Sequence, residues 1–442
     1  MKHYLWNRII LFILRFVAGP FVRRAMRYRC RKKKGPDTPS LIISNHNSNL
    51  DPALVAMGFS RHIYFITSEH ALRNGLPSKI LNFVFAPIPI NKTLTDVSSI
   101  KEIMRRIKAG ANVCLFAEGD RSFTGTTAPL TLSTAKLAKM SKADLITFRI
   151  DGGYFTTPRW SKSIRKGKMS GGIVNTYPAA ELKKMTAEQV LEIIERDIYV
   201  DAYEDQMTEP VSYRGKNLAE NIETVLYLCP CCKRIATIRS EGDRFSCDCG
   251  LSATYTETGF IKIEAPQLSN TTEDDKQQGT ASDSAPLAPD STPLAPDTAP
   301  LAPDTAPLAP GSTPRVPHSL TTVTDWGRWQ KQQLVEIVQN IGDEPICTHE
   351  GQQLFEVRVA TGKTLVREGT MKIYRETFDF AGITFPLREI TRFTVVGQMI
   401  LLFALDDGTT YEIRSAVPRS ALFYKEVFQI IKSGQQASKK GE

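Results

Sequence analysis

Residues 41–52 read Leu41-Ile42-Ile43-Ser44-Asn45-His46-Asn47-Ser48-Asn49-Leu50-Asp51-Pro52. The short apolar run at its start is typical of a buried strand, and the polar residues after it indicate a turn. Asp51 is a suitable N-cap for a following helix, with Pro52 at the first helical position. The stretch therefore predicts a strand, a turn and a helix in direct succession.

The same alternation continues along residues 37–220. Strands are expected at residues 41–44, 63–67, 112–116 and 145–150, and helices at residues 96–109, 133–142 and 186–198. Strands that alternate with helices predict an α/β domain around a largely parallel sheet.

The turn after the first strand carries His46 and Asp51, five residues apart. A carboxylate that close can orient an imidazole and stabilise its protonated form, so His46 could take a proton from a hydroxyl as a general base. A capped turn with an incidental histidine would have the same pattern. Both interpretations are open from this segment alone.

A second polar segment follows the strand at residues 112–116 and reads Ala117-Glu118-Gly119-Asp120-Arg121-Ser122. A glycine turn at the carboxyl end of a strand presents backbone amides where α/β sheets bind ligands. Arg121 has a planar set of donors that suits phosphate, and Ser122 adds a hydroxyl. Glu118 can hold Arg121 or contact an acceptor hydroxyl. Alone, the segment could equally be a surface turn with a salt bridge.

Together, the ordered pair N-H-x₄-D and F-x-E-G-x-R-S resembles the glycerolipid acyltransferase family over roughly residues 35–200, most closely its 1-acylglycerol-3-phosphate acyltransferases. The resemblance implies transfer of a fatty acyl group from acyl-CoA or an acyl carrier protein thioester to the hydroxyl of lysophosphatidic acid, giving phosphatidic acid. It implies that His46 is the base and Asp51 its partner, and that Glu118, Gly119 and Arg121 bind the phosphate region of the acceptor. No covalent enzyme intermediate and no catalytic metal are implied.

The sequence departs from the family pattern at three places. Lys92 stands where an arginine is usual near the middle motif and is expected to replace it as a phosphate contact, and Ala117 stands where proline is common. Only residues 145–150 represent the fourth motif. The departures bear on acceptor and acyl-chain specificity, so glycerol 3-phosphate or another lysophospholipid is an alternative acceptor. A membrane-tethered scaffold with a vestigial domain is the alternative from another class, but the intact His46, Asp51, Glu118 and Arg121 favour the enzyme.

The basic character of the chain is local. The whole chain has 442 residues and a formal charge of +9, while residues 1–36 hold eleven Lys or Arg and no Asp or Glu, which leaves −2 for residues 37–442. Residues 4–18 are apolar but include Arg8 and Arg15, which would share one stripe of a helix. This pattern predicts a helix in the membrane interface, with the following cations near anionic lipid on the cytoplasmic face. A signal peptide, a tilted membrane span and a core helix are the alternatives, and no nucleic-acid partner is predicted.

Five of the eight cysteines lie in residues 221–264. Cys229, Cys232, Cys247 and Cys249 form two short knuckles that resemble a zinc ribbon, with Cys231 as a substitute ligand. A closed thiolate set predicts a structural zinc ion, and a disulfide or free-thiol cluster is the alternative.

The end of the chain divides into a linker and a β-rich region. Residues 265–318 contain tandem Pro-rich repeats, which predict a disordered tether that by itself sets little geometry. Residues 319–442 predict a helix over residues 326–341 capped by Asp325, then antiparallel strands and an amphipathic helix over residues 420–432. That order looks like a small pleckstrin-homology-type module. The oligomeric state cannot be inferred from these features.

Overall fold

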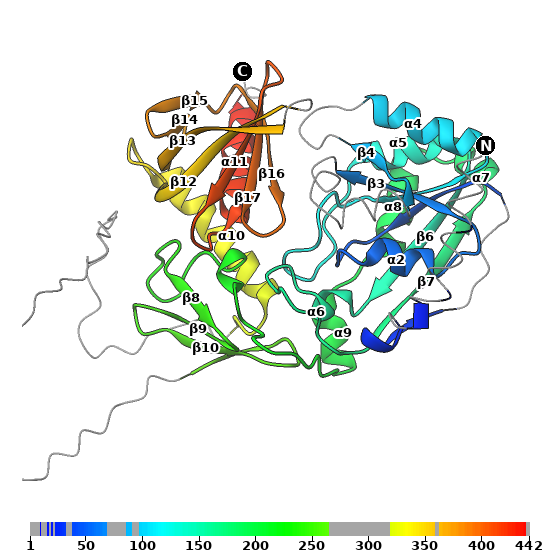
Figure 1. Cartoon of the computed structure of the whole chain (residues 1–442), viewed down its shortest axis with the longest axis horizontal. Helices are drawn as coiled ribbons and strands as arrows, with labels where there is room; N and C mark the ends of the chain where they lie inside the picture. The colour runs from blue at the N-terminus through cyan, green and yellow to red at the C-terminus, as the bar shows by residue number, and fades with distance from the viewer. Residues whose placement is uncertain are drawn as a thin grey trace, which may run out of the picture.

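The computed structural model of the whole chain describes Ile9, Phe16, Gly19, Pro20 and residues 23–31, 38–68, 85–90, 97–264, 319–358 and 362–438. The predicted interfacial helix lies almost wholly outside these residues, and Lys92 and the predicted linker at 265–318 lie entirely outside them. Figure 1 shows three parts, which we call the α/β unit (residues 28–208), the cysteine-rich unit (residues 222–263) and the C-terminal module (residues 319–438).

The α/β unit is built on one seven-stranded sheet of order β1-β7-β6-β2-β5-β3-β4. Its strands are β1 Tyr28–Cys30, β2 Ser40–Ser44, β3 Ile63–Ser68, β4 Ile88–Ile90, β5 Asn112–Phe116, β6 Asp144–Asp151 and β7 Met169–Tyr177. The block from β6 to β4 is parallel throughout, whereas β7 runs antiparallel to β6. The predicted largely parallel sheet is therefore confirmed, with β7 as a strand that the sequence pattern did not predict.

Helices cover both faces of this sheet. They are α2 Asp51–Ala56, α4 Val97–Lys108, α5 Leu132–Ser141, α6 Gly153–Thr156, α7 Ala179–Lys184, α8 Ala187–Ile198 and α9 Ala202–Thr208. One face packs Ile42 and Phe148 of the strands against α2, and the other packs Leu41 and Leu145 against α4, α5 and α8. Strand β2 is buried over its whole length, as expected for the centre of a parallel sheet. The loops at its carboxyl end are therefore held by a rigid support.

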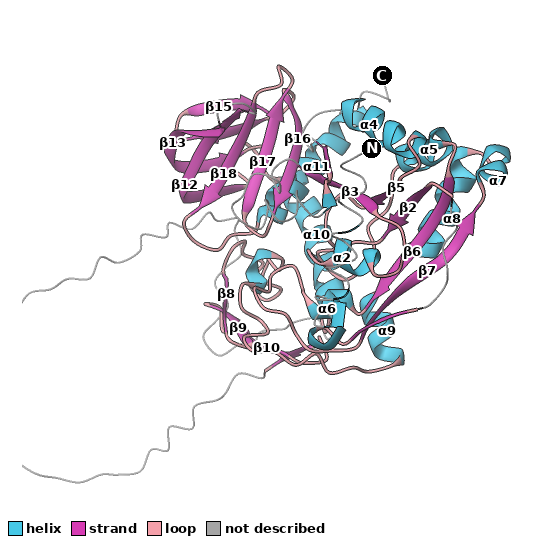
Figure 2. Cartoon of the chain, turned by 45° about the vertical axis from the view of Figure 1, so that its right-hand side comes forward, coloured by secondary structure: helices cyan, strands magenta, loops and turns pink. Residues whose placement is uncertain are grey.

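The two other parts are antiparallel. The cysteine-rich unit has a short 3₁₀ helix, Ile222–Thr224, and a four-stranded sheet made of β8 Ile238–Glu241, β9 Arg244–Cys247, β10 Ser252–Tyr255 and β11 Ile261–Ile263. The C-terminal module has α10 Val323–Asn340, α11 Ala421–Ser438 and a seven-stranded sheet (Figure 2). Its strands are β12 Cys347–Arg358, β13 Gly362–Ile373, β14 Thr377–Phe380, β15 Ile383–Pro386, β16 Ile390–Val396, β17 Ile400–Leu405 and β18 Thr410–Ser415. The antiparallel C-terminal sheet is confirmed, and the pleckstrin-homology likeness stays a prediction.

Two predicted helix caps are wrong. Helix α10 begins at Val323 because the hydroxyl of Thr322 accepts the Asp325 N–H at 2.9 Å, so Thr322 is the N-cap. Helix α2 begins at Asp51 itself, its N-cap is Leu50, and no side chain caps it. In both cases a polar side chain next to the helix start makes a different local hydrogen bond from the one expected.

The three parts pack directly against one another. The linker sequence by itself does not predict this arrangement. One continuous apolar cluster includes Phe155 of the α/β unit, Phe245 of the cysteine-rich unit and Trp326 of α10. The Trp326 indole N–H donates to the Leu228 carbonyl at 3.0 Å. The Ile261 N–H donates to the Thr321 carbonyl at 2.7 Å, so the two ends of the linker region lie side by side. Direct packing sets the geometry between the parts.

Candidate active site

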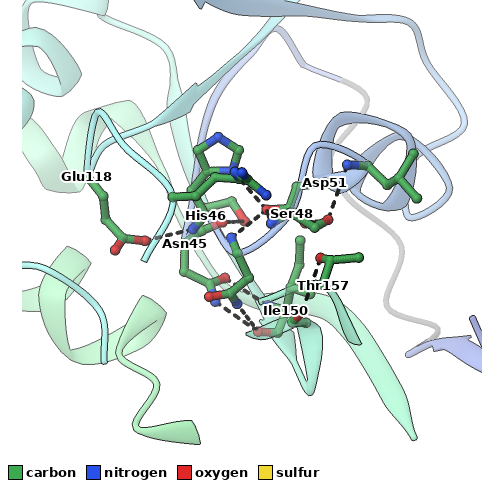
Figure 3. Close-up of polar contacts among 12 residues, drawn as sticks. Asn45, His46, Ser48, Asp51, Glu118, Ile150 and Thr157 are labelled. Atoms are coloured by element: carbon green, nitrogen blue, oxygen red, sulfur yellow. Dashed lines mark hydrogen bonds and ion pairs between the residues drawn. The ribbon is translucent and has the colours of Figure 1, made fainter. Parts of the chain in front are cut away.

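His46 lies in the loop that joins β2 to α2, and its ring is fixed on two sides. Its Nδ1 lies 2.8 Å from Asp51 Oδ2 (Figure 3). The ring also stacks on Phe116 at a centroid distance of 4.4 Å. The His46 side chain is 21 % exposed, whereas the Asp51 side chain is fully buried. With Nδ1 facing the carboxylate, Nε2 is the ring nitrogen left to meet a substrate, and it has no hydrogen-bond partner among the described residues.

The Asp51 carboxylate is an acceptor for the whole turn. Besides His46, it accepts the N–H of Asn47 at 2.6 Å, the N–H of Ser48 at 2.9 Å and the Ser48 hydroxyl. The carboxylate turns back toward this loop, and this is the physical reason that it does not cap α2. Asp51 thus sets both the conformation of the turn and the direction of the imidazole.

The second motif meets the first because β2 and β5 are parallel neighbours. Ser44 pairs with Phe116, so the loops that follow the two strands start from the same level of the sheet. The His46 N–H donates to Glu118 Oε1 at 2.7 Å, and the Ser122 N–H donates to the His46 carbonyl at 2.9 Å. The fold therefore places the two predicted motifs in direct contact.

The Glu118 carboxylate accepts hydrogen bonds from two backbone N–H groups. Its second oxygen accepts the Ala128 N–H at 2.9 Å, so the carboxylate joins three loop positions. Burial raises the pKa of Glu118 to about 8, against the opposing effect of the two backbone N–H groups. No ion pair between Glu118 and Arg121 occurs among the described residues.

Gly119 and Arg121 lie in the turn after β5, where the Gly119 N–H donates to the Phe116 carbonyl at 3.1 Å. Gly119 has φ +73°, a left-handed conformation that favours glycine. The Arg121 guanidinium makes no hydrogen bond or ion pair within the described part of the chain. Burial lowers the pKa of Arg121, while the nearby Asp51 and Asp120 carboxylates raise it. A partly buried arginine whose guanidinium has no partner among the described residues is suited to bind an anionic ligand.

The Ser122 hydroxyl is already used within its own loop. It donates to the Thr126 carbonyl at 3.0 Å and accepts the Gly125 N–H at 2.9 Å. Lys92, the remaining predicted substrate contact, lies outside the described residues.

The sequence analysis did not single out two further residues of this region. The side chain of Asn45 donates to the Ile150 carbonyl and accepts the Ile150 N–H, both at 2.8 Å, which ties the His46 turn to β6 (Figure 3). Arg159 donates from Nη1 to the Arg121 carbonyl at 2.9 Å. Asn45 is the first residue of the N-H-x₄-D motif, although no role was assigned to it, whereas Arg159 lies in no motif and had no signal.

Four cysteines of the cysteine-rich unit converge. The Sγ atoms of Cys229, Cys232, Cys247 and Cys249 all lie within 4.8 Å of one another. The Cys229–Cys249 and Cys232–Cys247 sulfur distances are 3.6 and 3.8 Å. A disulfide would need about 2.05 Å, whereas a tetrahedral zinc ion with bonds of about 2.3 Å separates its sulfurs by about 3.8 Å. The donor set and its spacing therefore fit a tetrahedral metal ion, with Cys231 outside the set of four.

No helix within the described residues has the length and apolar character needed to span a membrane. The predicted interfacial helix is not tested by this finding, because nearly all of it lies outside those residues.

The family model described as Acyltransferase matches residues 25–151. This match covers both motifs, and the predicted resemblance to acyltransferases is confirmed for this segment. No curated protein sequence matches the chain. Among solved structures, the chain is similar to the 1-acyl-sn-glycerophosphate (LPA) acyltransferase PlsC from Thermotoga maritima, with 15 % identity over 47 % of this chain and 96 % of that one, at a TM-score of 0.34. The resemblance to the acyltransferase family rests on the match of the family model to residues 25–151.

Proposed function

Because residues 25–151 form a domain of the acyltransferase family, we propose that this protein transfers a fatty acyl group from acyl-CoA or an acyl carrier protein thioester to the free hydroxyl of lysophosphatidic acid. The observation that carries the proposal is the contact between the His46–Asp51 pair and the loop of Arg121. The loop of the candidate base thus contacts the loop of a partly buried cation that has no partner among the described residues, which suits an acceptor with a hydroxyl and a phosphate.

His46 is the proposed general base. Asp51 accepts from Nδ1, so Nε2 can take the proton of the acceptor hydroxyl. The hydroxyl oxygen then attacks the thioester carbonyl, and a carbon–oxygen bond forms as the carbonyl opens to a tetrahedral intermediate. When the intermediate collapses, the carbon–sulfur bond breaks and the thiol leaves with the proton that His46 returns. The products are an ester, here phosphatidic acid, and the free thiol of the carrier.

Arg121 is the proposed contact for the acceptor phosphate. Its guanidinium can bind two phosphate oxygens at once, and the loop that carries it contacts the His46 backbone through the Ser122 N–H. Lys92 is a proposed second cation, and Glu118 supports the loop through its backbone contacts. Ser122 can contribute to binding only by giving up one of its loop hydrogen bonds.

The remaining parts have supporting roles in this proposal. The eleven cations of residues 1–36 would hold the site at an anionic lipid surface, on the cytoplasmic face, where amphiphilic acceptors reside. Cys229, Cys232, Cys247 and Cys249 would bind a structural zinc ion, because four thiolates leave no open position for a substrate.

The test is an acyl-transfer assay with the purified full-length chain, acyl-CoA and lysophosphatidate in mixed vesicles, with phosphatidate measured by mass spectrometry. Glycerol 3-phosphate and lysolipids with other headgroups serve as competing acceptors, and an acyl carrier protein thioester as the second donor. We expect lysophosphatidate to have the highest kcat/KM and His46→Ala to abolish transfer. Preference for another acceptor would contradict the acceptor assignment, and full activity of His46→Ala would remove the proposed base.

A further inference from the structure

The loop that holds Arg121 receives contacts from a part of the chain about 200–300 residues later. We call residues 117–126 the acceptor loop. Lys425 Nζ of α11 lies 2.8 Å from Asp120 Oδ2, and the Thr324 hydroxyl of α10 donates to the Thr124 carbonyl at 2.7 Å. Neither Lys425 nor Thr324 belongs to the segment that the acyltransferase family model matches.

A third contact reaches the loop through Arg159. Gln398, in the turn between β16 and β17, donates from Nε2 to the Arg159 carbonyl at 2.9 Å. Arg159 in turn donates to the Arg121 carbonyl, and its guanidinium lies over the Phe123 ring at 3.8 Å. Arg159 is only 4 % exposed, and burial lowers its pKa to about 10. A chain of contacts therefore joins the C-terminal sheet to the backbone of Arg121.

Close approach of α10 to the loop depends on a glycine. Gly327 lies in the interior of α10, where glycine is unfavourable relative to alanine. A Cβ atom at this position would lie 2.6 Å from Thr124 Cγ2, which is closer than carbon atoms pack. The glycine thus permits α10 to lie directly on the acceptor loop.

The ion pair of Lys425 also controls the charge next to Arg121. The side chains of Asp120 and Lys425 are 15 % and 22 % exposed, so solvent screens this pair only partly. The ammonium lies on the same aromatic ring as Arg159, 5.7 Å from the centroid of Phe123. If Lys425 were neutral, the Asp120 carboxylate would compete with an acceptor phosphate for Arg121.

We propose that the C-terminal module is a clamp that sets the conformation and charge of the acceptor loop, with Lys425 and Arg159 as positioning residues for Arg121. The identity of the ligand in this inference rests on the proposed function. The effect of the C-terminal module on the conformation of the acceptor loop does not depend on that ligand. The proposal assigns the C-terminal module a role in acceptor binding by the transferase.

The test compares Lys425→Met with Lys432→Met, the same substitution on the same helix, in the full-length chain. The first readout is amide hydrogen exchange over residues 117–126 without substrate. We expect roughly tenfold faster exchange in Lys425→Met and none of this change in Lys432→Met. The second readout is steady-state kinetics, where Lys425→Met should raise KM for lysophosphatidate about tenfold while KM for acyl-CoA and kcat stay within twofold.

A double variant separates charge from folding. Asp120→Asn added to Lys425→Met removes the carboxylate that has lost its ion pair with Lys425, so KM for lysophosphatidate should return to within about threefold of the wild type. Lys425→Arg should retain the wild-type exchange and KM. Unchanged exchange and unchanged acceptor KM in Lys425→Met, or equal effects in Lys432→Met, would overturn the clamp.

The two readouts keep this inference distinct from the proposed function. A wild type that does not acylate lysophosphatidate contradicts the proposed function, and the exchange experiment alone then decides the clamp. A wild type that acylates lysophosphatidate, with a loop that does not respond to Lys425→Met, refutes the clamp and leaves the function in place.

Discussion

Replacing Asp51 by asparagine would test the catalytic pair without disturbing the turn. Oδ2 accepts from His46, Asn47 and Ser48, and among the described residues Oδ1 accepts only the Ser48 hydroxyl. An amide whose oxygen takes the place of Oδ2 keeps the first three hydrogen bonds. Its NH₂ group can donate to the Ser48 hydroxyl, since a hydroxyl can reverse its role. Asp51→Asn should therefore remove charge while the geometry persists.

The expected loss follows from that charge. The imidazolium that forms as His46 takes a proton lies against the fully buried Asp51 carboxylate. Two unit charges about 4 Å apart interact by about 4 kcal/mol at an effective dielectric constant of about 20. Because about 1.4 kcal/mol corresponds to a factor of ten, kcat should fall by about 10³. This value lies within the range that general-base catalysis typically contributes.

The assay is acyl transfer to lysophosphatidate, with thermal unfolding measured on the same preparations. Asp51→Asn should have a Tm within a few degrees of the wild type. Asp51→Ala should in addition lose about 2–5 kcal/mol of unfolding free energy, because the buried N–H groups of Asn47 and Ser48 lose their acceptor. Adding His46→Ala to Asp51→Asn should lower kcat by a smaller factor than His46→Ala does in the wild type, because the two residues act as a unit. If Asp51→Asn kept more than about a tenth of the wild-type kcat, the role assigned to the pair would be refuted.

Three further changes have defined outcomes. Arg121→Gln should lower kcat/KM for lysophosphatidate by at least about tenfold and Arg121→Lys by less, since lysine lacks the planar donor pair; equal kinetics for the two variants would contradict a bidentate contact. Elemental analysis should find one zinc ion per chain. Cys247→Ser should lose this ion and Cys231→Ser should retain it, because Cys247 is one of the four converging cysteines and Cys231 is not. Burial and the nearby Arg419 lower the pKa of His349 to about 3. The unfolded chain therefore binds the proton more tightly, and stability should fall as the pH drops from about 6.5 toward 3, by at most about 1.4 kcal/mol per pH unit. Urea unfolding of His349→Gln should lack this part of the slope, and an unchanged slope would exclude His349 as its source.

Local sequence patterns predicted the strands that lie in the interior of the α/β sheet. The strands at β2, β5 and β6 are short apolar runs because each lies inside the sheet with helices on both faces. By contrast, β7 contains Gly171 and Gly172 and has no strand-like pattern. A Cβ atom at Gly171 would lie 2.5 Å from the Tyr28 hydroxyl, so close packing against β1 explains the glycine. The first half of β13 is exposed, and its polar residues likewise do not indicate a strand.

The sequence alone identified the residues of the candidate site, because they lie in two short segments at strand ends. His46, Asp51, Glu118 and Arg121 could be named from those segments, and the acyltransferase family match covers both. Their meeting followed from the expected parallel sheet, in which neighbouring strands end at the same edge.

Only the tertiary structure decided what surrounds that site. The contacts of Lys425, Gln398 and Arg159 with the acceptor loop join segments that no local pattern relates. They arise because one apolar core holds the three parts of the chain together across a linker whose own sequence sets no geometry. Hydrogen bonds and ion pairs between distant segments depend on how those surfaces pack. Periodicity and motifs in the sequence therefore indicate the candidate reacting groups. They do not indicate the distant residues that hold these groups in place.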